Sequence, residues 1–91
     1  DRQETEEKRY AEIEQAMTEA GYGEIKIREA QAVYSFALFN LSGDDVAEKL
    51  TECFSAETDE ELVEKINGAF YTAFSVDEIS AILESVRQEY G

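Results

Sequence analysis

Apolar residues recur at steps of three and four along most of the chain, which is the spacing of one face of an α-helix. In the first twenty residues, charged and amide side chains occupy the opposite face. The expected inner face of this first helix consists of Tyr10, Ile13, Met17 and Ala20. Glycine just past the last periodic residue readily adopts the left-handed conformation that ends a helix, and glycines stand at positions 21 and 23. The pattern therefore predicts a helix over residues 2–20 and a turn at 21–23.

Residues 24–41 fit two patterns. Ile25 and Ile27 alternate as in a strand, whereas a helical step joins the later apolar residues. The stretch 33–41 (VYSFALFNL) is apolar nearly all round, which predicts burial on most sides as a central helix or an interior strand. A strand pair would need a turn near residues 29–32, and EAQA lacks the Gly, Asn, Asp or Pro chemistry of hairpin turns. We therefore expect a helix and keep a short hairpin as the alternative.

Three further helices are indicated in the second half of the chain. Ser42 lies three residues before Asp45, and apolar residues follow at helical spacing, which predicts a third helix from about Gly43 to Ser55. Thr58 with Glu61, and Ser75 with Glu78, form capping-box patterns that open a fourth and a fifth helix. The expected inner faces are Val46, Leu50, Cys53 and Phe54, then Leu62, Ile66, Ala69, Phe70 and Ala73, then Val76, Ile79, Leu83, Val86 and Tyr90.

Asn67-Gly68 gives the main opposing signal, because Asn-Gly is the preferred two-residue turn of a β-hairpin. The preceding residues ELVEKI do not alternate, however, and a glycine within a helix costs only about 1 kcal/mol. We therefore predict an all-α fold, a small single-domain helical bundle of four to five helices over residues 1–91. The alternative is an α+β fold with a short hairpin within residues 24–41 or around Asn67-Gly68.

The net charge of the chain limits the kinds of partner that we expect it to bind. The chain has 22 acidic and 8 basic side chains, a formal net charge of −14, which repels nucleic-acid phosphates and anionic lipid surfaces. No apolar stretch approaches the roughly 18 residues of a membrane span, and the charged start DRQETEEKRY does not resemble a signal peptide. We therefore expect neither direct nucleic-acid binding nor a membrane partner. A lone cysteine fits a reducing compartment, which favours a cytoplasmic location.

The sequence contains few residues in patterns suited to catalysis. Histidine, the commonest general base near neutral pH and a frequent metal ligand, does not occur in the sequence. Cys53 falls on the expected inner face of its helix, so its thiol is interpreted as core filling rather than as a nucleophile. No calcium loop, phosphate loop or dinucleotide fingerprint is present. We therefore expect a protein that is not an enzyme and that holds neither a cofactor nor a metal ion.

A run of acidic residues from Asp44 to Glu64 is the most distinctive feature, with nine acidic side chains against Lys49 alone. Acids near helix starts complement the helix dipole, which accounts for about half of the run, but Glu48, Glu52 and Glu64 lie beyond the first turn. Carboxylates four residues apart on a helix repel each other, so their repetition suggests a basic partner or a solubilising role. The predicted partner-binding residues are Asp44, Asp45, Glu48, Glu52, Glu60, Glu61, Glu64 and Tyr71.

Two functions fit this pattern. The first is a non-catalytic binding module that docks an acidic helical face on a basic protein surface, as an inhibitor that competes with nucleic acid for that surface, a form of DNA mimicry. The partner would then be a nucleic-acid-binding protein, and the chain a monomer or a homodimer. The alternative is a structural or adaptor subunit that self-associates or binds a partner through apolar residues 33–41, with charge serving only solubility. Rising salt should weaken the first interaction and preserve the second.

Overall fold

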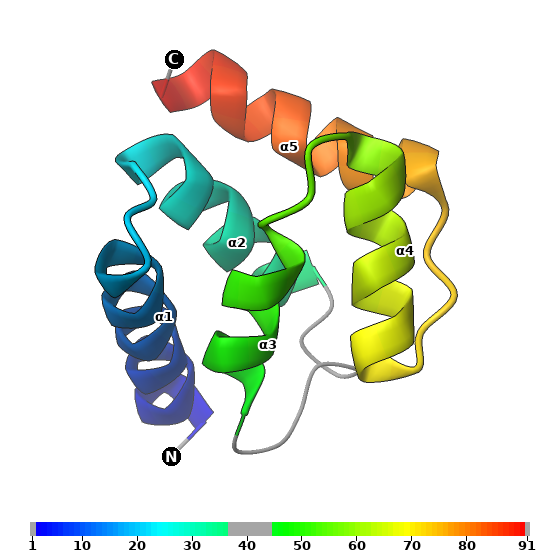
Figure 1. Cartoon of the computed structure of the whole chain (residues 1–91). Coiled ribbons are helices and arrows are strands. Elements are labelled where there is room, and N and C mark those ends of the chain that lie inside the picture. The colour runs from blue at the N-terminus through cyan, green and yellow to red at the C-terminus, as the bar shows by residue number, and fades with distance from the viewer. Residues whose placement is uncertain (1, 37–44, 91) are drawn as a thin grey trace.

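The computed structural model describes residues 2–36 and 45–90, with side chains from Glu7 onward. This part of the chain forms five helices and no strand (Figure 1). They are α1 (Arg2–Glu19), α2 (Glu24–Phe36), α3 (Val46–Cys53), α4 (Asp59–Phe70) and α5 (Val76–Tyr90). The predicted all-α bundle is confirmed. Neither hairpin forms among these residues, because 24–36 are helical and Asn67-Gly68 lies within α4.

The helices form a closed ring of neighbours. Helix α1 packs on α2 and α3, α2 packs on α5, and α4 joins α5 to α3 (Figure 1). Each helix turns its apolar face toward the middle of the ring, where the side chains are removed from water. The apolar side chains with no exposed surface in the described residues are Ile13, Met17, Ala30, Val33, Leu50, Ile66 and Ile79. One shared core therefore holds all five helices in place.

The ends of three helices follow the sequence signals closely. Gly21 adopts a positive φ of 92°, and the Tyr22 N–H donates to the Met17 carbonyl at 3.0 Å, so the glycine ends α1 as expected. At the start of α4, the Thr58 hydroxyl accepts a hydrogen bond from the Glu61 N–H at 3.1 Å. The matching contacts at α5 join Ser75 and Glu78 in both directions. The capping boxes are confirmed.

Helix α3 is shorter than predicted. It begins at Val46 rather than near residue 43, and Asp45 precedes it without a side-chain capping hydrogen bond. The helix ends at Cys53, and the Ser55 N–H then donates to the Glu52 carbonyl in a turn. Ser42 and Gly43 lie outside the described residues. Local spacing thus located α3 correctly but overestimated its length.

Several apolar residues expected in the core are exposed. Ala20 lies in the turn after α1, and Ala73 lies in the α4–α5 linker, because both helices end earlier than their apolar pattern does. Phe36, at the end of α2, is 47% exposed, and Tyr90 in the last turn of α5 is 48% exposed. The expectation of an all-round buried segment therefore holds for Val33 and Tyr34 and is wrong for Phe36. Residues 37–41 lie outside the described part.

Asn67 explains where α4 ends. Its side-chain Oδ1 accepts hydrogen bonds from the Phe74 N–H at 2.9 Å and from the Thr72 hydroxyl at 2.8 Å. Its Nδ2 donates to the Phe74 carbonyl at 3.0 Å. Asparagine therefore supplies turn chemistry here through its side chain, by tying the linker 71–75 back onto the helix.

A buried carboxylate joins three of the helices. Glu29 on α2 is 1% exposed and accepts a hydrogen bond from Arg87 Nε on α5 at 2.9 Å. Arg87 also reaches Asp59 at the start of α4, at 3.4 Å, and Lys26 lies 4.0 Å from Glu29. Burial alone would lower the pKa of Arg87, but the charges of Glu29 and Asp59 outweigh it and raise the pKa above its usual value. This network fixes α2, α4 and α5 relative to one another.

Candidate functional site

The predicted partner-binding residues lie at the surface. Asp44 lies outside the described residues, and the other seven are all exposed. They are Asp45, Glu48, Glu52, Glu60, Glu61, Glu64 and Tyr71. Within residues 7–36 and 45–90, no ion pair closer than 4 Å includes any of these carboxylates. Their negative charge is therefore directed to solvent rather than neutralised inside the fold.

Two pairs of glutamates form two ridges on adjacent helices. Glu48 and Glu52 lie one turn apart on α3, on the side opposite its buried residues, and form the α3 ridge. Glu60 and Glu64 lie one turn apart on α4 and form the α4 ridge. Within each ridge the spacing is roughly 6 Å, so the two charges repel by a few tenths of a kcal/mol. A cation placed between them would relieve this repulsion.

Glu61 has a structural role. Its Oε2 accepts a hydrogen bond from the Glu57 N–H at 3.3 Å, and its own N–H donates to the Thr58 hydroxyl. This arrangement satisfies backbone donors at the start of α4, where the helix dipole also favours negative charge. Helix capping therefore accounts for Glu61 without a partner.

A groove that contains lysines separates the two ridges, contrary to the picture of one uninterrupted acidic face. This groove of about 240 Å³ lies between α3 and α4 and is lined by Lys49, Glu52, Cys53, Lys65, Gly68 and Ala69. Lys49 lies 5.6 Å from the centre of the Phe70 ring. The 100° step of a helix places Glu60 and Glu64 on average about a third of a turn away, around α4, from the α4 residues that line the groove. Lys65, directly after the acidic run, was the sequence signal that could have indicated this interruption.

Tyr71 combines strain with exposure. It ends α4 in the left-handed conformation, with φ 55° and ψ 43°, and is the only non-glycine residue of positive φ in the described part. Its side chain is 94% exposed, while its N–H donates to the Asn67 carbonyl. A residue with a Cβ pays about 1–2 kcal/mol in this conformation. Tyr71 follows the last residue of α4, the helix that carries the α4 ridge, so an exposed aromatic ring lies at the C-terminal end of that helix.

The Cys53 thiol lies at the bottom of the α3–α4 groove and is 3% exposed. Burial, and to a lesser extent the charge of Glu52, raise its pKa to about 11, while the charge of Lys65 partly opposes them. The thiol therefore stays protonated at neutral pH, where a nucleophile or a metal ligand would have to be a thiolate. Its position and its pKa agree with the interpretation of Cys53 as core filling.

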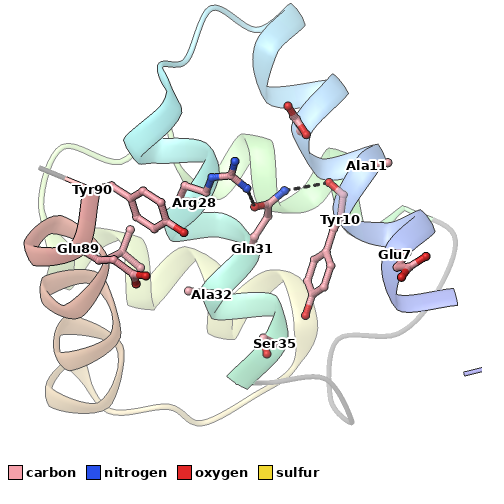
Figure 2. Close-up of a pocket in the computed structure, with 11 residues that line it drawn as sticks. Glu7, Tyr10, Ala11, Arg28, Gln31, Ala32, Ser35, Glu89 and Tyr90 are labelled. Carbon is pink, nitrogen blue, oxygen red and sulfur yellow. Dashed lines mark hydrogen bonds between the residues drawn. The ribbon is translucent and has the colours of Figure 1, made fainter. Parts of the chain in front are cut away.

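A second groove was missed by sequence reasoning. It measures about 580 Å³ and runs between α1, α2 and α5, with tyrosines and glutamates along its sides (Figure 2). It forms only where α5, from the other end of the sequence, packs beside α1 and α2, so no single periodic pattern reveals it. The only hint was the presence of small residues, such as Ala11 and Ala32, beside polar ones on α1 and α2.

The described residues form neither a metal site nor a membrane-spanning helix. Among them, no three histidine, cysteine or acidic side chains are grouped so that they could hold a metal ion. No helix in this part of the chain is long and apolar enough to span a bilayer. Surface charge, the exposed Tyr71 and the two grooves thus remain as the features from which a function can be argued. Comparison with protein-family models, with curated proteins and with solved structures gave no match.

Proposed function

We propose that this chain is a non-catalytic protein-binding module that docks the α4 ridge, Tyr71 and the α3 ridge on a basic surface of another protein. By occupying that surface the module competes with nucleic acid. The observation that carries the proposal is Tyr71, a ring that is 94% exposed and held in a strained backbone conformation at the end of the helix that carries the unpaired Glu60 and Glu64 carboxylates. Strained conformations persist where the surrounding structure fixes them, and they cluster at binding and catalytic sites.

The ring and the carboxylates would contribute differently to binding. A tyrosine that becomes buried in an interface supplies apolar contact and a hydroxyl, and such residues often carry much of the binding energy. The carboxylates attract a basic partner over distance and orient it, which mainly accelerates association. Asn67 holds the linker at Tyr71 through three hydrogen bonds, so the ring is presented with little further loss of backbone freedom.

The proposed competition with nucleic acid follows from the kind of protein that an acidic surface attracts. Basic protein surfaces of high charge density are typical of proteins that hold phosphate backbones. A chain of net charge −14, with rows of carboxylates on rigid helices, offers such a surface repeated negative charge without a nucleotide. The same charge disfavours direct contact of this chain with DNA or RNA.

A capture experiment with matched variants tests the proposal. The chain is immobilised, and basic proteins are captured from a lysate with and without added duplex DNA. The Glu60→Gln/Glu64→Gln variant is compared with Glu19→Gln/Glu84→Gln, which removes the same charge from exposed positions on α1 and α5. We expect the α4 variant to capture less, the control to capture as the natural chain does, and DNA to displace the captured proteins. Equal capture by both variants, or capture unaffected by DNA, would contradict the proposal.

One observation favours the adaptor alternative. Phe36 is 47% exposed and contacts Phe74, with ring centres 5.6 Å apart, so an apolar surface is available at the end of α2. Binding through this surface would persist or strengthen as salt rises, whereas docking through the ridges would weaken. Measuring capture over a range of salt concentrations therefore separates the two functions.

A further inference from the structure

The groove between α1, α2 and α5 has a floor and two walls. Helix α2 lies between the other two and forms the floor, with Ala32 at its base, while α1 and α5 each pack on α2 (Figure 2). Tyr10 from α1 and Tyr90 from α5 stand on the two sides. The small side chains of Ala11 and Ala32 leave the space open. A volume of about 580 Å³ is in the range of ligand sites, and it accommodates a few side chains rather than a whole helix.

The charged residues of the groove favour a cation. Glu7 and Glu14 lie on the α1 wall and Glu89 lies on the α5 wall, all three exposed. No ion pair in the described part of the chain includes any of them. The one basic lining residue, Arg28, already has Glu24 at 3.8 Å and the Tyr90 ring at 5.6 Å. The walls therefore present three unpaired carboxylates to an occupant.

Arg28 also lacks one hydrogen-bond acceptor. Its Nη1 donates to Gln31 Oε1 at 3.0 Å, and Gln31 in turn donates to the Tyr10 carbonyl at 3.1 Å (Figure 2). Its Nε has no partner, and among the described residues it is the only buried side-chain nitrogen or oxygen in that state. An unsatisfied buried donor costs free energy that a nearby acceptor would recover. An occupant that carries a carbonyl oxygen would supply this acceptor after a small shift of the side chain.

We propose that this groove binds a short basic segment of a partner protein. Lysine or arginine side chains of the segment pair with Glu7, Glu14 and Glu89, its apolar side chains fill the space above Ala32, and a main-chain carbonyl accepts from Arg28. A second copy of this chain is disfavoured as the occupant because each copy has a net charge of −14. A nucleic acid is disfavoured by the same carboxylates.

This inference does not depend on the function proposed for the α3 and α4 ridges. The residues that line the groove belong to α1, α2 and α5, and none of them belongs to α3 or α4. Each site can therefore fail without the other, and variants in one leave the residues of the other unchanged.

A defined peptide tests the proposal. The probe is a fluorescent hexapeptide of alternating lysine and leucine, acetylated and amidated at its ends, and its binding is followed by anisotropy and by amide NMR shifts. A glutamate–leucine peptide and hexylammonium serve as comparisons, because the first reverses the charge and the second lacks a carbonyl. Ala32→Phe fills the floor of the groove, and Ala81→Phe adds the same ring at an exposed position of α5 that does not line it. If Ala32→Phe does not fold, Ala11→Phe on the exposed wall replaces it.

We expect the lysine–leucine peptide to shift the amide signals of Ala11, Ala32 and Val86, and to bind Ala32→Phe at least about tenfold more weakly than Ala81→Phe. The glutamate peptide should not bind, and hexylammonium should bind more weakly than the peptide. Three outcomes would overturn the proposal. They are equal affinity for the two phenylalanine variants, shifts confined to the α3 and α4 ridges, and binding of hexylammonium as tight as that of the peptide.

Discussion

Tyr71 has a strained backbone and an exposed ring, and substitutions can separate the two. Tyr71→Gly removes the ring and also the Cβ that makes φ 55° costly. Tyr71→Ala removes the ring but keeps the Cβ. The N–H of residue 71 can still donate to the Asn67 carbonyl in both variants. Because the ring is 94% exposed, neither change removes appreciable buried apolar surface.

The expected stability change follows from two opposing effects. A non-glycine residue pays about 1–2 kcal/mol in the left-handed region, which glycine avoids. Glycine gives the unfolded chain more freedom, which costs about 0.5–1 kcal/mol relative to alanine. We therefore expect Tyr71→Gly to be about 0.5–1 kcal/mol more stable than the natural chain and Tyr71→Ala to be about equal to it. For a domain of this size the glycine variant should melt a few degrees higher.

Urea unfolding followed by circular dichroism measures these differences, with all three chains compared at the same pH and salt. Both variants should lose partner capture under the proposed function, because both lack the ring. A glycine variant that is less stable than the alanine variant would refute the reasoning, since it would mean that φ at residue 71 carries no strain. Full capture by either variant would exclude Tyr71 as a contact residue.

Further predictions concern the core and the ridges. Arg87→Met should lower the free energy of unfolding, measured in urea, by about 3 kcal/mol, because it leaves the buried Glu29 carboxylate without its closest cation. Adding Glu29→Gln to this variant should recover part of the loss. Equal losses in the single and double variants would show that the charge of Glu29 is not the cause. Gly68→Ala should stabilise α4 by up to about 1 kcal/mol, since a Cβ there meets nothing within 4 Å; a loss of stability would contradict the helical geometry. Replacing all four ridge glutamates by glutamine should leave urea stability unchanged or slightly higher while slowing association with a captured basic partner at low salt; an unchanged rate would favour the adaptor function. Cys53 should resist alkylation in the native state near neutral pH and react once denaturant is added. Because the pKa of its thiol rises from 9.0 to about 11 on folding, the stability of the natural chain relative to Cys53→Ala should be constant below pH 9. Above pH 9 that stability should fall, by about 2–3 kcal/mol at pH 11. Rapid native labelling would contradict the burial of the thiol.

The features that the sequence predicts well are local ones. Thr58 and Glu61 are three residues apart, so their capping contacts depend only on the chain adopting one helical turn. The end of α1 at Gly21 is similarly local, because glycine adopts a φ of 92° without the steric cost that a Cβ would add. The exposure of the ridge glutamates followed from the helical step once the buried face was identified.

Features that depend on distant residues could not be predicted in the same way. A glutamate on α2 has no reason in its own neighbourhood to be buried, and Glu29 is buried because Arg87 arrives from α5. The division of the acidic surface depends on how α3 and α4 pack, which brings Lys49 and Lys65 into one groove. The exposure of Phe36 could not be predicted either, because apolar periodicity does not say which side chains a neighbouring helix will cover.

The pairing of Glu29 with Arg87 also has a consequence for how the chain is made. The two residues are 58 positions apart, so a ribosome adding about 5–20 residues per second needs roughly 3–12 s to supply the arginine after the glutamate. During that interval the carboxylate has only Lys26 nearby on its own helix, and burying it would be costly. We therefore expect α2 to keep the Glu29 side chain in water until α5 has been synthesised, which would delay closure of the core around an incomplete set of helices.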